Sequence, residues 1–276
     1  MTYKIVSDSS SNLFHMENTE YAYVPLKILT DEKEYVDSPE LDLNQMIEEL
    51  KEYKGKSGTS CPNVYDWLHA FGDADMIFGV AITSNLSGCF SASQQAKAEY
   101  EQTHKGAKVF ILDSLSTGPE MQLILEKMRE LTAGDFEFED VKSKIQAYKK
   151  HTHLLFSLES LDNMARNGRV KPTVAKLAGL LGIRIVGKAS EEGTLQPLHK
   201  CRGEKGALQK IIEGMKKEGF HGGKVRIAHC MNENAAKSLK EHIIKEFPNS
   251  NIEIGICTGL CSFYAEKGGV LVGYES

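Results

Sequence analysis

Strand-like and helix-like segments alternate along the first half of the chain. Apolar runs at 3–7, 76–83 and 108–114 have the composition of buried strands, and the helical pattern at 87–103 lies between the second and the third. A strand followed by a helix must cross back over the sheet before the next strand, which produces parallel pairing. We therefore predict an α/β domain over residues 1–150, built on an open, mainly parallel sheet with flanking helices.

The second half shows a different order of elements. Two strand-like runs flank the turn 190–193 (SEEG), which predicts a β-hairpin over 183–203. Helical patterns separate the later strand-like runs, at 224–230 and 251–257. This order is typical of an α+β domain with a mixed sheet, which we assign to residues 151–276.

Charge and composition exclude several classes of protein. The chain has 33 basic and 38 acidic side chains, a net charge of -5, and this balance argues against nucleic-acid binding. No apolar run approaches the ~20 residues of a membrane helix, and no signal-peptide pattern precedes the first strand. We therefore expect a cytoplasmic protein that does not span a membrane.

The cysteines do not form a metal-binding pattern. Cys257 and Cys261 have the spacing C-x-x-x-C, and no second Cys or His pair lies nearby at zinc spacing. His151 and His153 are two residues apart, so on a strand they would face opposite sides. We expect reduced, mostly buried thiols, no metal site and no cofactor.

Short polar side chains gather in the turns that surround the predicted strands. The turns 7–12 (SDSSSN), 58–62 (GTSCP), 83–88 (TSNLSG) and 113–118 (DSLSTG) are rich in Ser and Thr. Ligands of open parallel sheets bind beyond the carboxyl ends of the strands, where we expect these turns to meet. Ser87 fits two roles, because a serine at this point can cap the following helix or help to hold an anion at its start.

The sequence contains no recognisable catalytic machinery. Nucleophile-elbow, P-loop and dinucleotide-binding motifs are absent from it. Asp8, Asp113 and His229 follow strands and could act as acids or bases, but such residues also commonly bond nearby backbone groups. Since a serine nucleophile needs an adjacent base, binding is a better hypothesis than hydrolysis or phosphoryl transfer.

Five segments, in order along nearly the whole chain, resemble motifs of the DegV family. They are KIVSDSSSNL (4–13), GTSCPN (58–63), ITSNLSGCFSA (82–92), SLESLDNMARNGRV (157–170) and LHKCRGEKGAL (198–208). The family's carboxyl-terminal G-x-H-x-G-P-G motif is replaced by GLCSFYAEKGG, which puts Tyr264 roughly where the motif has His. Cys61 and Cys89 stand where the family usually has Gln and Thr.

The resemblance implies a non-catalytic carrier that holds a long-chain fatty acid, such as palmitate, stearate or oleate, between two domains. In some bacteria such proteins present the acid to a fatty acid kinase that makes acyl phosphate. The family's carboxylate contacts fall on Thr59 and Ser87, and we extend the predicted binding site to their neighbours and two further candidates. These additional residues are Ser60, Asn85, Gly88, Tyr264 and Arg202.

Arg166, Arg169 and Lys171 form a basic cluster that could dock an acidic partner. The alternative is a solvated turn in which Arg169 pairs with a nearby carboxylate. The missing family His also leaves open a different ligand, such as another small anionic metabolite.

Overall fold

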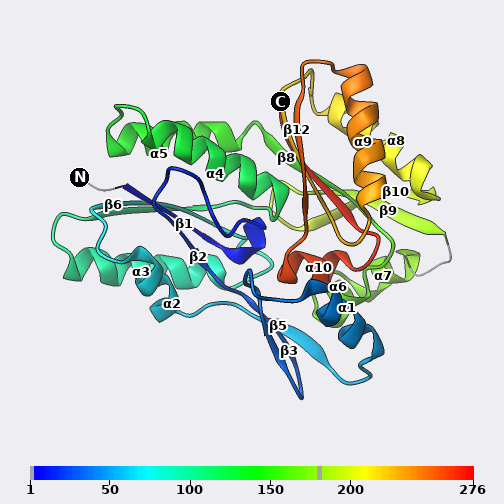
Figure 1. The fold of residues 1–276 in the computed structure, drawn as a ribbon, viewed down its shortest axis with the longest axis horizontal. Helices are drawn as coiled ribbons and strands as arrows, with labels where there is room; N and C mark the ends of the chain where they lie inside the picture. Colours follow the sequence, from blue (N-terminus) through cyan, green and yellow to red (C-terminus); the bar gives the residue numbers. More distant parts are fainter. Residues whose placement is uncertain (1–2, 179–181) are drawn as a thin grey trace.

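A parallel four-stranded sheet forms the centre of the first half. The computed structural model describes residues 3–178 and 182–276 (Figure 1). The strand order is β2-β1-β6-β7, with every neighbouring pair parallel. The predicted open parallel sheet is confirmed, and its strands are β1 (Tyr3–Asp8), β2 (Tyr21–Val24), β6 (Met76–Ala81) and β7 (Lys108–Asp113).

Helices cover both faces of this sheet. Figure 1 shows α2 (Val64–Phe71) and α3 (Cys89–Thr103) on one side, and α4 (Pro119–Thr132) and α5 (Phe138–Lys149) on the other. The core between these layers is apolar, with Trp67 fully buried. The helix predicted from residue 62 starts only at Val64, because Asn63 accepts from Asp66 N and forms a capping box with it.

A small antiparallel sheet extends from the first half, and here the sequence-based expectations were partly wrong. The single strand expected over 21–30 is two strands, because Pro25 cannot donate to a ladder and the chain leaves the first sheet there. The segment expected as a turn at 55–62 contains β5, which pairs with β3. The order is β4-β3-β5, with β3 (Lys27–Thr30), β4 (Glu34–Val36), β5 (Ser57–Ser60) and helix α1 (Leu43–Glu52) beside them.

The second half is built on a six-stranded mixed sheet, as predicted. Its order is β10-β9-β8-β13-β11-β12, and only β11 and β12 are parallel among its neighbouring pairs. The predicted hairpin is present as the antiparallel pair β9 and β10. The strands are β8 (Thr152–Leu158), β9 (Ile183–Ala189), β10 (Leu195–Arg202), β11 (Lys224–His229), β12 (Asn251–Ile256) and β13 (Val270–Glu275).

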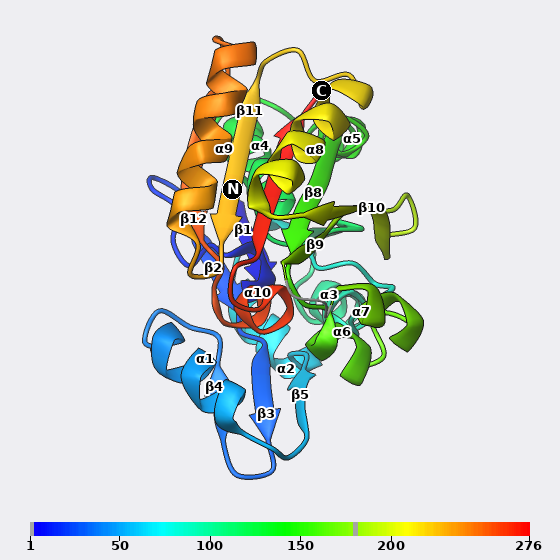
Figure 2. The same cartoon turned by 90° about the vertical axis from the view of Figure 1, so that its right-hand side faces the viewer.

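The helices of the second half lie in two groups around this second sheet. Figure 2 shows α8 (Glu204–Lys217) and α9 (Glu233–Glu246) side by side over one face, where they bury a second apolar core. The other three lie at the end nearest the small sheet: α6 (Asp162–Arg166), α7 (Pro172–Ala178) and α10 (Gly259–Ala265). The helix expected over 173–182 matches α7 as far as 178, and residues 179–181 of that prediction lie outside the described residues.

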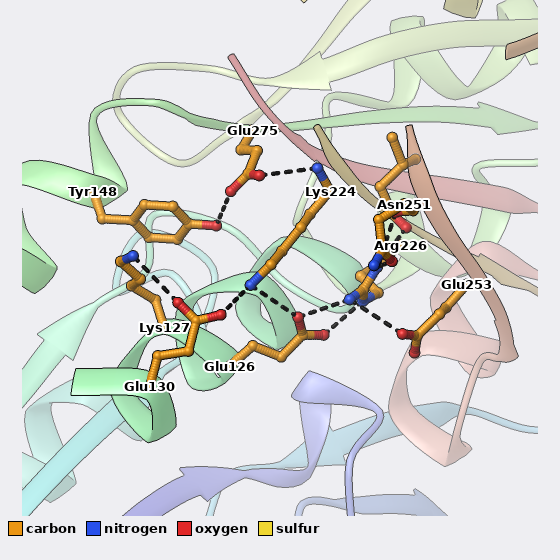
Figure 3. A network of polar contacts seen from close by, with 10 residues as sticks. Glu126, Lys127, Glu130, Tyr148, Lys224, Arg226, Asn251, Glu253 and Glu275 are labelled. Carbon is orange, nitrogen blue, oxygen red and sulfur yellow. Dashed lines mark hydrogen bonds and ion pairs between the residues drawn. The ribbon is translucent and has the colours of Figure 1, made fainter. Parts of the chain in front are cut away.

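Helix α4 joins the two halves, because it packs against strands of both large sheets. A network of charges lies along this contact (Figure 3). Arg226 on β11 donates to both carboxylate oxygens of Glu126 on α4, at 2.5 and 2.8 Å, and Lys224 pairs with Glu130. Tyr148 on α5 donates to Glu275 on β13 at 2.7 Å. We call this set of residues the charged seam.

None of the helices in the described ranges 3–178 and 182–276 has the length and apolar character that crossing a membrane requires. The strands of the first half end at Asp113 and the six-stranded sheet begins at Thr152. The exact domain boundary near residue 150 stays a prediction.

Candidate binding site between the two halves

The polar turns meet at the carboxyl edge of the first sheet. Asp8, at the end of β1, is fully buried and accepts from Ser10 N at 3.1 Å and from Ile82 N at 2.7 Å. Burial raises the pKa of the Asp8 carboxyl to about 6, although these hydrogen bonds oppose the rise. Asp8 therefore links the turn at 7–12 to the start of the turn at 83–88 through hydrogen bonds.

Backbone hydrogen bonds connect the turn at 113–118 to the turns at 7–12 and 83–88. Thr83 N donates to Ser116 O at 3.0 Å, and Gly118 N donates to Ser10 O at 2.8 Å. Asp113 Oδ1 accepts from Ser84 N at 3.1 Å. The role expected of Asp113 as a backbone-bonding turn residue agrees with this geometry.

The turns at 83–88 and 113–118 line part of a cavity, together with Leu26, Thr59 and Cys61 from the first half and residues of the second half. Apolar side chains from β8, β9, β10, β13 and α10 line much of it. The apolar lining residues are Leu26, Ile82, Leu86, Leu154, Phe156, Leu158, Met164, Ala189, Leu195, Leu260, Ala265 and Leu271. The others are Thr59, Cys61, Thr83, Ser87, Gly88, Ser116, Thr117, Arg169, Gly193, Thr194, Cys261 and Tyr264.

Several hydroxyl groups converge on this cavity from distant parts of the chain. Thr59 Oγ1 on β5 lies 2.8 Å from Tyr264 Oη on α10, and both side chains line the cavity. Ser87 also lines it, while its Oγ accepts from Cys89 N at 3.3 Å. Ser87 therefore lines the cavity, but the expectation that it caps the helix is wrong, because Gly88 is the N-cap of α3 and no side chain caps this helix.

Arg169 is the charged residue among the described residues that line the cavity. Its Nε donates to Leu86 O at 3.2 Å and its Nη1 donates to Asn167 O. No salt bridge to Arg169 is found within residues 3–178 and 182–276. Burial raises the pKa of Tyr264, while the bond to Thr59 and the charge of Arg169 oppose the rise. The cavity therefore carries one positive charge beside a set of neutral donors.

Three residues of the predicted binding site are not among the lining residues. Ser60 donates to Cys61 O at 3.3 Å, and Asn85 Nδ2 donates to Glu192 O at the tip of the β9–β10 hairpin. Arg202 lies exposed at the end of β10. The structure therefore brings Thr59, Ser87, Gly88 and Tyr264 together and leaves the other three outside.

The basic cluster is divided between the surface and the cavity. Arg166 and Lys171 are exposed, whereas Arg169 is partly buried and lines the cavity. The carboxylate partner considered for Arg169 is not found among the described residues. Sequence reasoning assigned Arg169 to docking because its neighbours are basic, and it had no signal for the direction of the side chain.

Asp8, Asp113 and His229, which were considered as catalytic acids or bases, do not line the cavity. His229 Nδ1 accepts from Asn232 N at 3.3 Å, and burial lowers the pKa of its imidazole. Burial raises the pKa of the Cys261 thiol to about 12, so this lining cysteine is held as a neutral thiol. Within the part of the chain that the structure describes, no group of three or more His, Cys, Asp and Glu side chains could hold a metal ion.

The cavity also has contributors that sequence reasoning did not identify. Gly193 and Thr194 come from the hairpin tip, and Thr83 Oγ1 donates to Gly193 O at 2.9 Å. Leu260 and Cys261 come from α10, which was not predicted as a helix. The turn-forming SEEG sequence was the signal for the tip, but nothing in the sequence showed which surface it would meet.

Comparison with known proteins places this geometry in a family. The model described as "Uncharacterised protein, DegV family" matches residues 2–276. A DegV domain-containing protein of Streptococcus pneumoniae is 41% identical over 279 residues, covering 100% of this chain and 99% of that protein.

Two solved structures are similar over their full lengths. One is a DegV family protein from Eubacterium eligens loaded with heptadecanoic acid, with 40% identity, a TM-score of 0.98 and 100% of both chains covered. The other is the Streptococcus pneumoniae Fatty Acid Kinase (Fak) B3 protein loaded with linoleic acid. It has 41% identity, a TM-score of 0.97, and covers 100% of this chain and 99% of that one.

Proposed function

The chain belongs to the DegV family, and on that basis we propose that it binds one long-chain fatty acid between its two halves and presents the carboxylate to a fatty acid kinase. The observation that carries the proposal is a cavity that is apolar over most of its lining and has hydroxyl groups and one arginine at a single place. Two similar proteins are described as loaded with heptadecanoic and linoleic acid.

The apolar lining supplies most of the binding free energy in this proposal. Burying a methylene group contributes ~0.8 kcal/mol, so a chain of about 14 methylene groups contributes roughly 11 kcal/mol before the costs of binding. Leu154, Phe156 and Leu271 line the wall contributed by the second half. Palmitate, stearate and oleate all fit this description, since an apolar wall discriminates weakly between similar chains.

The head group is assigned to the hydroxyl cluster. In our proposal Thr59 and Ser87 donate to the carboxylate, Tyr264 donates through Thr59 or directly, and Arg169 supplies the positive charge. A buried carboxylate without such partners would be costly, because desolvation disfavours the charged form. Tyr264 can donate one hydrogen bond but carries no positive charge at neutral pH, which leaves the compensating charge to Arg169.

The head-group end lies where a kinase could reach it. Cys61 and Gly88 line the cavity and are exposed, so the hydroxyl cluster is close to the surface. The exposed Arg166 and Lys171 lie near Arg169 in the sequence and are the candidate contacts for an acidic partner. A carrier with this geometry keeps the chain buried while its carboxylate is phosphorylated.

Native mass spectrometry of the purified protein, followed by solvent extraction, tests the proposal. We expect a mass excess that corresponds to one fatty acid, and uptake of palmitate or oleate by the delipidated protein. The variant with Thr59→Ala and Ser87→Ala should bind at least 10-fold more weakly, since each lost hydrogen bond to a charged group costs about 1.5–3 kcal/mol. The matched control is Thr103→Ala, whose hydroxyl bonds to its own helix and to His104.

The proposal is wrong if the protein is empty as purified and takes up neither acid after delipidation. Kinase presentation is tested separately, by measuring acyl phosphate formed by a bacterial fatty acid kinase with this protein as the source of lipid. If the protein binds lipid that the kinase cannot phosphorylate, presentation to a kinase is wrong and the protein stores or transports fatty acid.

A further inference from the structure

A buried aspartate outside the cavity holds the helix that carries Tyr264. Asp37 follows β4 and its side chain is fully buried, with 0% of the residue exposed. Asp37 was not predicted from the sequence as a site residue, and it does not line the cavity. No salt bridge to Asp37 is found within residues 3–178 and 182–276, so the carboxylate is satisfied by neutral groups.

Ser9 of the first half is one of these groups, and the others belong to the start of α10, more than 200 residues further along the chain. Asp37 Oδ1 accepts from Gly259 N at 2.6 Å, and Oδ2 accepts from Leu260 N at 3.1 Å. Oδ2 also lies 3.3 Å from Thr258 Oγ1, whose shorter contact is to Asn12 Oδ1 at 3.0 Å. The first N–H groups of a helix have no partner within the helix, and Thr258 makes no side-chain cap of its own. Asp37 thus caps α10 from outside the helix.

The position of Asp37 is itself fixed from the cavity side. Its N–H donates to Leu26 O at 2.9 Å, and Leu26 N donates to Ser9 Oγ at 3.0 Å. Leu26 lines the cavity. The cap is therefore attached to the same wall as the predicted head-group site.

Helix α10 is held at its two ends by different halves of the molecule. Asp37, from the first half, holds the first turn, and Asn163 Nδ2, from the second half, donates to Phe263 O at 2.8 Å near the last turn. Tyr264 lies five residues after Gly259, so a shift or rotation of the first turn moves its hydroxyl. The 2.8 Å contact between Tyr264 and Thr59 tolerates only a few tenths of an ångström before it weakens.

We propose that Asp37 is a positioning residue that sets the carboxylate affinity of the cavity by fixing α10 and, through it, the hydroxyl of Tyr264. The inference rests on the proposed function and extends it, because it assigns control of the head-group site to a residue that does not touch the ligand. Head-group recognition therefore depends on Asp37 much more than recognition of the chain does, because only two of the twelve apolar lining residues in the described part of the chain, Leu260 and Ala265, lie on α10.

Asp37→Asn is the primary variant. The amide keeps the size of the side chain but turns an NH₂ group toward one of the helix donors, so the helix start must shift. Calorimetric titration with tetradecanoate and with tetradecan-1-ol distinguishes head from chain, because the alcohol has the same chain and no carboxylate. Tyr264→Phe and the double variant complete a thermodynamic cycle.

The expected pattern has three parts. Asp37→Asn and Tyr264→Phe each weaken tetradecanoate binding by roughly 10- to 100-fold, as expected for losing one hydrogen bond to a charged group. Each changes tetradecan-1-ol binding by less than about 3-fold. The double variant binds tetradecanoate at most about 2-fold more weakly than the single variant with the lower affinity, because both substitutions remove the same interaction.

A second variant reaches the same cap by a different route. A Cβ on Gly259 would lie 2.9 Å from Asp37 Oδ1 and 2.8 Å from Leu41 Cδ2, so Gly259→Ala pushes the helix start away without changing charge. It should reproduce the selective loss of tetradecanoate binding. The matched control is Asp42→Asn, which alters the cap of α1, where Asp42 Oδ1 accepts from Gln45 N at 2.9 Å, and should leave both ligands bound normally.

Two results would overturn the inference. One is equal weakening of tetradecanoate and tetradecan-1-ol by Asp37→Asn, which would make Asp37 a residue of general stability. The other is a crystal structure of ligand-free Asp37→Asn in which Tyr264 and Thr59 remain in hydrogen-bond contact. The crystal structure requires no ligand, so it distinguishes this failure from failure of the proposed function, in which wild-type protein would bind no fatty acid.

Discussion

The two halves meet along two seams of opposite character. At the charged seam, α4 contributes Glu126 and Glu130, and β11 contributes Arg226 and Lys224 (Figure 3). At the cavity, two side-chain hydrogen bonds, from Thr83 to Gly193 and from Asn85 to Glu192, join the β9–β10 hairpin to the first half. We call these two bonds the clasp.

The two seams differ in the strength and the geometry of the interactions that form them. A bidentate arginine–carboxylate pair combines strong attraction with a fixed geometry, so the charged seam sets the relative position of the halves. The clasp consists of neutral hydrogen bonds, each worth about 1 kcal/mol. Rigidity therefore lies away from the cavity, and the wall that encloses the proposed ligand is held by weaker contacts.

The largest expected effect comes from breaking the charged seam. Arg226 is 5% exposed, so Arg226→Met leaves Glu126 without its main partner in a largely buried place. We expect the free energy of unfolding, from urea titration, to fall by about 3–5 kcal/mol. The control Lys237→Met removes an exposed pair with Glu233 and should cost far less than Arg226→Met, because water screens that pair.

The matched double variant sharpens this test. Arg226→Met combined with Glu126→Leu removes both charges and should recover much of the lost stability. A single variant that costs no more than Lys237→Met would show that the charged seam does not determine how firmly the halves are joined.

The next effect concerns the sign of the pH dependence at two carboxyl groups, Asp8 among the turns of the first half and Glu130 at the charged seam. Burial raises the pKa of Asp8 from 3.8 to about 6, so the stability linked to Asp8 is present below about pH 4 and is lost as the pH rises through 6. The shift corresponds to about 3 kcal/mol over that interval. The unfolding free energy of wild type minus that of Asp8→Asn should therefore decrease between pH 4 and pH 7.

Glu130 should behave in the opposite way. Burial alone would raise its pKa, but the hydrogen bonds and charges of Lys224 and Lys127 lower it below the usual value of 4.5. Its contribution is thus present above pH 4.5 and is lost as the pH falls below that value. The same difference measured with Glu130→Gln should decrease on acidification, and a shared sign for the two variants would contradict this contrast between Asp8 and Glu130.

The smallest effect is expected at the clasp. Gly193 and Gly203 stand near the two ends of β10 with φ of +74° and +77°, so alanine is strained at both. A Cβ at Gly193 would lie 2.8 Å from Leu115 Cα and even closer to Thr83 Oγ1, whereas a Cβ at Gly203 would have nothing within 4 Å. Gly193→Ala should therefore cost about 1–3 kcal/mol more than Gly203→Ala in urea unfolding.

Equal costs for the two glycine variants would mean that the hairpin tip adapts without loss, and that the clasp contributes little. A larger cost for Gly193→Ala, together with faster dissociation of a bound fatty acid in stopped-flow measurements, would show that the clasp restrains the cavity wall.

Local patterns predicted most elements of the fold, because they depend on neighbouring residues. Alternating strands and helices determined the parallel sheet, and the SEEG turn determined the hairpin. Strand β5 and helix α10 were missed for a common reason. The sequence SGTS has little intrinsic preference for a strand and pairs only because β3 lies beside it, and GLCSFYA begins as a helix with a cap that comes from Asp37.

The candidate site divides in the same way. The sequence by itself determined that Ser/Thr-rich turns would gather at the carboxyl edge of a parallel sheet, because strand direction and crossover handedness leave few other places for them. It also singled out Thr59, Ser87 and Tyr264, through a family resemblance. Only the tertiary structure decided that Arg169 faces the cavity while Arg202 lies exposed, and that Asn85 reaches a hairpin 107 residues away. Side-chain direction depends on contacts between distant segments, and a linear pattern carries no record of them.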